Sequence, residues 1–162
     1  MHYKVHLFAI AMLLIYGFTT PTDTATLRTY FEKGRSQKTY AEQLRQVTAL
    51  QDKALVKAYH GTAWTLLAKH HSNPYKKLEF LKTGLNTLNS AVLMDAADIE
   101  IRYLRFAVET NIPAIVSFTS HIAADKTMLL NNLKSAHPYF SAIKAYLMAS
   151  PRLTAEEKKK LP

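Results

Sequence analysis

Cysteine is missing from this 162-residue sequence, and glycine and proline are scarce, with four and six residues. The absence of cysteine excludes disulfides, a thiol nucleophile and thiolate metal ligands. The scarcity of glycine and proline excludes collagen-like and low-complexity chains. Because 48% of the residues are hydrophobic, we expect a packed globular core that is stable without crosslinks.

Long hydrophobic runs are lacking except near the N-terminus, where residues 5–18 are almost entirely apolar and follow Lys4. This run is shorter than the roughly 20 residues that a membrane-spanning helix needs. A basic residue, a short apolar run and then small and polar residues are the order typical of a secretory signal peptide. We therefore predict a signal peptide over residues 1–22, cleaved between Gly17 and Ala25. A buried N-terminal helix and an uncleaved anchor are the alternatives.

The remaining residues, 23–162, are predicted to form a single exported domain in the periplasm or outside the cell, with no further membrane-spanning helix. The chain has a formal net charge of +9. Such a charge favours acidic partners or a weak attraction to anionic surfaces. Nucleic acid is not an expected partner of an exported protein.

Strict alternation of apolar and polar residues is also lacking, so strands are not expected. Apolar residues recur instead at helical spacings of three and four. The clearest series, predicted to form a continuous buried seam, is Leu78, Leu81, Leu85, Leu88 and Val92. The predicted helices cover about residues 24–33, 36–50, 52–69, 74–92, 98–111, 120–133 and 138–150, before a short turn capped by Thr154 and Glu157. Asn73, ahead of Pro74, and Asp98 are the predicted N-cap residues of two of these helices. The pattern predicts an all-α fold of antiparallel helical hairpins with about six to seven helices.

Small side chains are concentrated on one face of the predicted helix 52–69, around Gly61. A glycine inside a helix costs about 1 kcal/mol relative to alanine, and close contact with another helix is the expected compensation. Trp64 lies one turn further along the same helix and is expected to anchor the core.

Two stretches resemble known helical proteins. Residues 89–100, NSAVLMDAADIE, resemble the junction between two tetratricopeptide repeats, with Gly61 and Trp64 at the small and aromatic positions of the preceding helix. The usual proline is replaced by Ala97 or its neighbour, and the spacing from Gly61 to Ala91 is about ten residues too long for a regular repeat. The resemblance therefore implies one degenerate unit in an array without regular repeats.

Residues 58–133 resemble a group of uncharacterised secreted helical proteins of Bacteroidota-type bacteria. The resemblance is carried by AYHGTAWTLLAKH, by IEIRYLRF, by residues 111–113 and by residues 122–126. It implies a helical fold and export, and it supplies no mechanism because that group has no assigned activity.

Patterns typical of catalysis and metal binding are lacking. The sequence has no Gly-x-Ser-x-Gly elbow, no glycine-rich phosphate loop and, beyond the signal, no His-x3-His or Glu-x-x-His pair. The paired carboxylates Glu156 and Glu157 fit a helix cap better than acid–base chemistry. We therefore predict no catalytic residue, no metal site, no cofactor and a protein that is not an enzyme.

The predicted helix 98–111 is apolar apart from a charged stripe that includes Arg102, Arg105 and Glu109. Arginines on a mostly buried helix require carboxylate partners, so the first interpretation is internal pairing. The acidic residues within reach are Glu109, Asp95, Asp98 and Asp125. The functional alternative is that one arginine projects into a groove and holds a carboxylate of a partner peptide with its bidentate fork.

A second candidate site lies at the start of the helix 74–92, where aromatic and basic side chains precede a helix N-terminus that could receive an anion; a solvated basic face is the alternative. Together, the candidate binding residues are Arg102, Arg105, Tyr103, Glu109, Trp64, Tyr75 and Lys76, and His71 and Lys77 lie beside the last two.

The leading functional interpretation is a protein- or peptide-binding adaptor or scaffold, whose partner is another protein or peptide of the envelope. The alternative is a carrier of apolar small molecules or lipids, with its pocket between the helix 98–111 and the helix of Trp64. An envelope enzyme of unrecognised type is the third possibility. A large closed apolar cavity would favour the carrier, and an open groove lined by Arg, Tyr and Lys would favour the adaptor.

Overall fold

The computed structural model describes residues 23–50, 52–113 and 121–162. In these ranges the chain forms eight helices and no strand, which confirms the all-α prediction. The helices are α2 (Thr24–Gly34), α3 (Lys38–Thr48), α4 (Ala54–His70), α5 (Pro74–Met94), α6 (Ile99–Thr110), α7 (Ile122–Asn132), α8 (Phe140–Ala149) and α9 (Ala155–Lys159). The last of these is the short capped turn that the sequence predicts. The predicted signal peptide lies outside the described residues.

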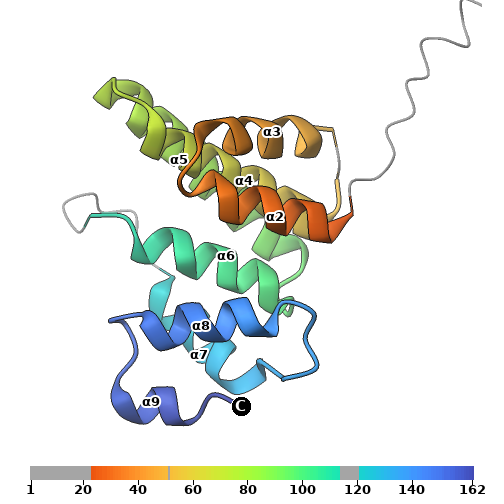
Figure 1. Ribbon diagram of the computed structural model, residues 1–162, viewed down its shortest axis with the longest axis vertical. Coiled ribbons are helices and arrows are strands. Elements are labelled where there is room, and N and C mark those ends of the chain that lie inside the picture. Colours follow the sequence, from red (N-terminus) through yellow and green to blue (C-terminus); the bar gives the residue numbers. More distant parts are fainter. Residues whose placement is uncertain (1–22, 51, 114–120) are drawn as a thin grey trace, which may run out of the picture.

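Consecutive helices pack as adjacent pairs, α2 with α3, α4 with α5 and α6 with α7. Helix α4 also contacts α2, α3 and α6, so it forms the centre of the first half of the molecule. Helix α6 lies between this half and the C-terminal group of α7, α8 and α9 (Figure 1). Among the described residues, no helix is long and apolar enough to cross a membrane.

Short polar side chains begin four of the helices. Asp23 caps α2, Asn73 caps α5, Asp98 caps α6 and Thr154 caps α9, each accepting hydrogen bonds from backbone amides of the first turn. The caps of α5, α6 and α9 confirm the sequence predictions. Helix α8 begins later than Pro138, the predicted start, because the preceding residues form a turn.

The contact between α4 and α5 is a direct approach of two backbones at Gly61 and Gly84. A Cβ atom added to Gly61 would lie 2.7 Å from the carbonyl oxygen of Gly84, and one added to Gly84 would lie 2.6 Å from that of Gly61. The close helix contact predicted for Gly61 is therefore present. The sequence did not identify Gly84 as its partner.

The seam predicted along α5 is buried only in its second half. Leu85, Leu88 and Val92 belong to the core, whereas the side chain of Leu78 is 40% exposed and that of Leu81 is half-buried. The first turns of α5 extend past the helices that cover the rest, so the helical period alone overestimates burial there.

Trp64, predicted to anchor the core, is half-buried and packs against the core from its edge. Its indole packs on Phe80 with ring centroids 5.0 Å apart and donates a hydrogen bond to His60.

Candidate functional site

Helix α6 is the most charged buried element, and its start is fixed by two aspartates. Asp95 accepts hydrogen bonds from the amides of Ala97 and Asp98, and Asp98 accepts hydrogen bonds from those of Glu100 and Ile101. This double cap sets the register that points Glu100, Arg105 and Glu109 into the protein.

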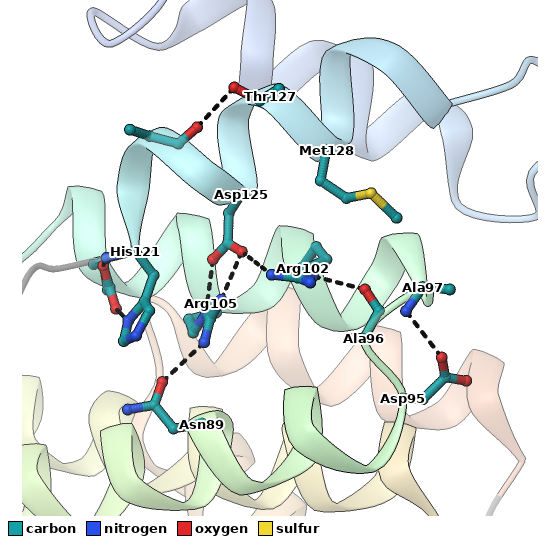
Figure 2. Close-up of polar contacts among 12 residues, drawn as sticks. Asn89, Asp95, Ala96, Ala97, Arg102, Arg105, His121, Asp125, Thr127 and Met128 are labelled. Carbon is teal, nitrogen blue, oxygen red and sulfur yellow. Dashed lines mark hydrogen bonds and ion pairs between the residues drawn. The ribbon is translucent and has the colours of Figure 1, made fainter.

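Asp125 of α7 joins both arginines of α6 (Figure 2). Arg105 donates from Nε to Oδ2 and from Nη2 to Oδ1, each at 2.7 Å, and Arg102 donates from Nη1 to Oδ1 at 2.9 Å. The Asp125 side chain is fully buried, and that of Arg105 is 5% exposed. Arg105 also binds Asn89 of α5, and Arg102 binds the carbonyl of Ala96. Of the acidic partners considered from the sequence, Asp125 is the one that the arginines meet.

The second carboxylate in contact with this region is Glu109 of α6, which binds His121 at the start of α7. One carboxylate oxygen accepts the amide of His121 at 2.9 Å, and the other lies 2.7 Å from its Nδ1. The sequence interpretation in which Glu109 pairs with Arg105 along its own helix is therefore wrong, because Asp125 already occupies that guanidinium.

The third carboxylate, Glu100, meets Arg28 of α2. The guanidinium donates from Nε and Nη2 at 2.9 and 2.6 Å, and the hydroxyl of Tyr59 donates to the same carboxylate. The hydrogen bond to Glu100 raises the pKa of Arg28, and burial together with the charge of Glu100 raises the pKa of Tyr59. Nothing local in the sequence indicates this pair, because the two residues are 72 positions apart.

In this group of residues, called the α6 cluster below, each of the three carboxylates already binds an arginine or a histidine. Its members are Arg28, Glu100, Arg102, Arg105, Glu109, His121 and Asp125. Bidentate arginine–carboxylate pairs of this kind are strong and directional, and they offer neither a free base nor a free anion site. In the described part of the chain, no group of three His, Asp or Glu residues is placed to hold a metal ion.

A concave apolar groove of about 560 Å³ lies between α4, α5 and α6. Its lining is mainly apolar, and the larger apolar side chains are Phe31, Leu66, Leu78, Leu81, Val108 and Ile112. The groove is also lined by Thr62, Thr65, Ala68, Pro74, Ala107, Asn111, Pro113 and Tyr146. Leu78, 40% exposed, opens onto solvent at one wall. The volume falls in the range of about 300 to 1,000 Å³ that is usual for ligand sites.

The polar lining of the groove is basic. Arg35, Lys69 and Lys77 line it, and none of the described aspartates or glutamates does. Arg35 forms a half-exposed ion pair with Glu32 at 3.0 Å, and Lys69 donates to the backbone carbonyl of Arg35 at 2.7 Å. The three cations come from α4, from α5 and from the residue after α2, and only the packing of these helices brings them together.

None of the binding residues proposed from the sequence lines this groove. Arg102, Arg105 and Glu109 are held in the α6 cluster. Tyr103 is buried, with Phe31, Tyr139 and Tyr146 edge-on around its ring, and burial raises the pKa of its hydroxyl.

The second proposed site is exposed and its amides are occupied. Tyr75 is 83% exposed, Lys76 pairs with Glu79, and Asn73 accepts the amides of both Tyr75 and Lys76. Lys77, the next residue, does line the groove. A binding role for the seven residues named from the sequence stays a prediction.

Searches against protein-family models, curated proteins and solved structures found no match to this chain. The resemblance to secreted helical proteins therefore stays a prediction as well, and the described fold is that of an all-helical protein with paired helices.

Proposed function

We propose that the protein is a non-enzymatic polypeptide-binding module, and that the groove between α4, α5 and α6 receives an apolar stretch of its partner. The helix pairs would then form a tetratricopeptide-like array without regular repeats, since stacked helix pairs commonly present concave binding surfaces. The signal-like run at residues 5–18 supports an exported, periplasmic or extracellular location. The partner would accordingly be another protein or peptide of the envelope.

The observation that carries this proposal is the apolar wall left open to water. Leu78 is 40% exposed at the groove and half-buried Leu81 stands beside it, both on the helical seam that is buried further along α5. Contiguous apolar surface that remains exposed commonly marks a binding site. Arg35, Tyr146 and the two lysines at this groove match the lining expected of an adaptor.

Selection from a random peptide library, with the full-length protein as target, tests the proposal. The most enriched peptide is synthesised, labelled and titrated by fluorescence polarisation. Full burial of a leucine side chain is worth about 1.5 to 3 kcal/mol, and Leu78 is 40% exposed before binding. Covering the remaining area is therefore worth roughly 1 kcal/mol, and we expect Leu78→Gln to weaken binding about three- to eightfold.

Leu93→Gln is the matched control, since Leu93 lies on the same helix, is 87% exposed and does not line the groove. This variant should bind as the wild type does, and both variants should unfold at the wild-type denaturant midpoint. The proposal fails if no enriched peptide binds, or if the two leucine variants bind with equal affinity.

A carrier of apolar small molecules or lipids is the second candidate, favoured by the groove volume of about 560 Å³ and by its position between α6 and the helix of Trp64. Labelled oleate is the probe. One-to-one binding of oleate that Leu78→Gln abolishes, in a protein that selects no peptide, would replace the first proposal with this one.

A further inference from the structure

The cations of the groove are less fully paired with carboxylates than the arginines around α6. In the α6 cluster, Arg28, Arg102 and Arg105 each bind a carboxylate that is at most 2% exposed. At the groove, only Arg35 has a carboxylate partner, and that pair is half exposed on both sides. Lys69 donates one of the three N–H groups of its ammonium to a backbone carbonyl.

Of the three cations that line the groove, Lys77 has neither the carboxylate partner of Arg35 nor the backbone carbonyl bound by Lys69. It is exposed on the first turns of α5, one helical turn before Leu81, and among the described residues its ammonium has no carboxylate within ion-pair distance. Apolar walls beside such cations lower the local dielectric and strengthen the field at the groove mouth. A ligand carboxylate placed there would be attracted by Lys77 and Lys69 together.

This inference rests on the proposed polypeptide binding. We propose that the bound segment carries an acidic residue beside its apolar residues. Its carboxylate would lie at Lys77 and Lys69, and its apolar side chains would pack against Leu78 and Leu81. The start of α5 does not itself hold the carboxylate, because Asn73 already accepts its amides. The lysine side chains therefore supply the recognition of the acid.

Two labelled synthetic peptide pools test this inference. They share the same mixed Leu, Val and Phe positions and differ only in carrying Glu or Gln at the flanking positions. At low salt the full-length protein should bind the Glu pool more tightly, by roughly two- to five-fold for each exposed ammonium–carboxylate contact. The preference should shrink as salt is raised, because exposed pairs are screened.

Lys77→Gln should remove most of the preference for the Glu pool and leave binding of the Gln pool unchanged. Lys134→Gln is the matched control, because Lys134 is exposed on the connection between α7 and α8 and does not line the groove. This variant should keep the full preference.

The outcomes separate the two proposals. If neither pool binds, the polypeptide-binding function fails, and with it this inference. If both pools bind equally, or if Lys77→Gln keeps the preference, the acidic preference alone is overturned. Binding of oleate that depends on Lys77, without binding of either pool, would assign the groove to a small amphipathic acid and overturn both.

Discussion

The helix pairs α4–α5 and α6–α7 have the same architecture but are held together by opposite kinds of contact. Across α4–α5, Gly61 and Gly84 allow the two backbones to touch, so the interface depends on the absence of side-chain atoms. Across α6–α7, Asp125 receives two arginines, so the interface depends on the presence of a charge. Adding a side-chain atom should therefore destabilise the α4–α5 pair, and removing the carboxylate should destabilise the α6–α7 pair.

The two helix pairs also differ in whether the basic residues beside them bind a carboxylate of the protein. The arginines of α6 are occupied by Asp125 in the contact with α7, whereas the lysines beside the glycine-mediated pair have no carboxylate in the groove that they line. The basic residues of the buried helix α6 are therefore held by an internal carboxylate, whereas two of the three basic residues that line the groove have no ion pair among the described residues.

The largest effect should come from removing the charge that joins α6 to α7. Asp125→Ala leaves Arg105, which is 5% exposed, without its carboxylate. Loss of one partner of a buried ion pair typically costs about 3 to 5 kcal/mol, and we expect the free energy of unfolding to fall by that amount in urea titrations. Glu156→Ala, which breaks an exposed pair with Lys159, should cost less than about 1 kcal/mol.

A double variant distinguishes lost charge from lost packing. Asp125→Leu combined with Arg105→Met removes both members of the bidentate pair and restores apolar volume. It should be more stable than Asp125→Ala, because a buried cation without a partner is the main penalty. Equal stabilities of the single and double variants would show that the charge is not what holds α7 on α6.

Local signals in the sequence predicted the helices and their ends well. The caps at Asn73, Asp98 and Thr154 depend on residues within one turn, so spacing alone identifies them. The close helix contact at Gly61 could also be predicted from the sequence, because a glycine inside a helix lowers helix stability and a close contact is the expected compensation. Its partner Gly84 was not, because pairing of two helices depends on the whole packing arrangement.

Contacts between distant segments account for what the sequence did not predict. The partner of Glu100 is Arg28, 72 residues away, and no periodicity links them. The groove combines the end of α2 with the end of α6, and its cations lie on segments far apart in the sequence, so no local pattern links them. The exposure of Leu78 could not be read either, because it depends on which helices cover the first turns of α5.

The second effect in size should come from adding one methyl group to the α4–α5 contact. A Cβ on Gly84 would lie 2.5 Å from Cγ2 of Thr65 and 2.6 Å from the carbonyl oxygen of Gly61, so the helices must separate. Overpacking of this kind costs about 1 to 3 kcal/mol, which outweighs the gain of about 1 kcal/mol in helix propensity. We expect Gly84→Ala to lower the denaturant midpoint.

Gly34→Ala provides the comparison, because its added Cβ would lie 3.1 Å from Cδ1 of Leu66 and 3.2 Å from the amide nitrogen of Ala41. The longer distances require only small shifts, so its effect should be clearly smaller than that of Gly84→Ala. A Gly84→Ala variant as stable as the wild type would mean that the close approach of the two backbones is not what holds α4 and α5 together.

The smallest effect should be a pH dependence of the free energy of unfolding that comes from His60 of α4, whose hydrogen-bond partners are neutral side chains. His60 lies between Thr48, whose hydroxyl is 2.9 Å from its Nδ1, and Trp64, whose indole donates to its Nε2 at 3.1 Å. Since Nε2 accepts a hydrogen bond, the folded state holds the neutral ring. Burial, with the nearby charge of Arg45 adding to it, lowers the pKa of His60 below its ordinary value of 6.5.

A lowered pKa in the folded state means that the unfolded chain binds the proton more readily. The free energy of unfolding should therefore be constant above about pH 7, fall as the pH drops through the ordinary histidine range, and level off below the folded pKa of His60. His60→Gln keeps a donor and an acceptor without a titrating group, so it should lose this part of the slope. Emission of Trp64, the only tryptophan in the chain, follows both unfolding and the local contact. Parallel profiles of wild type and His60→Gln between pH 5 and 7 would show that His60 does not link α4 to pH.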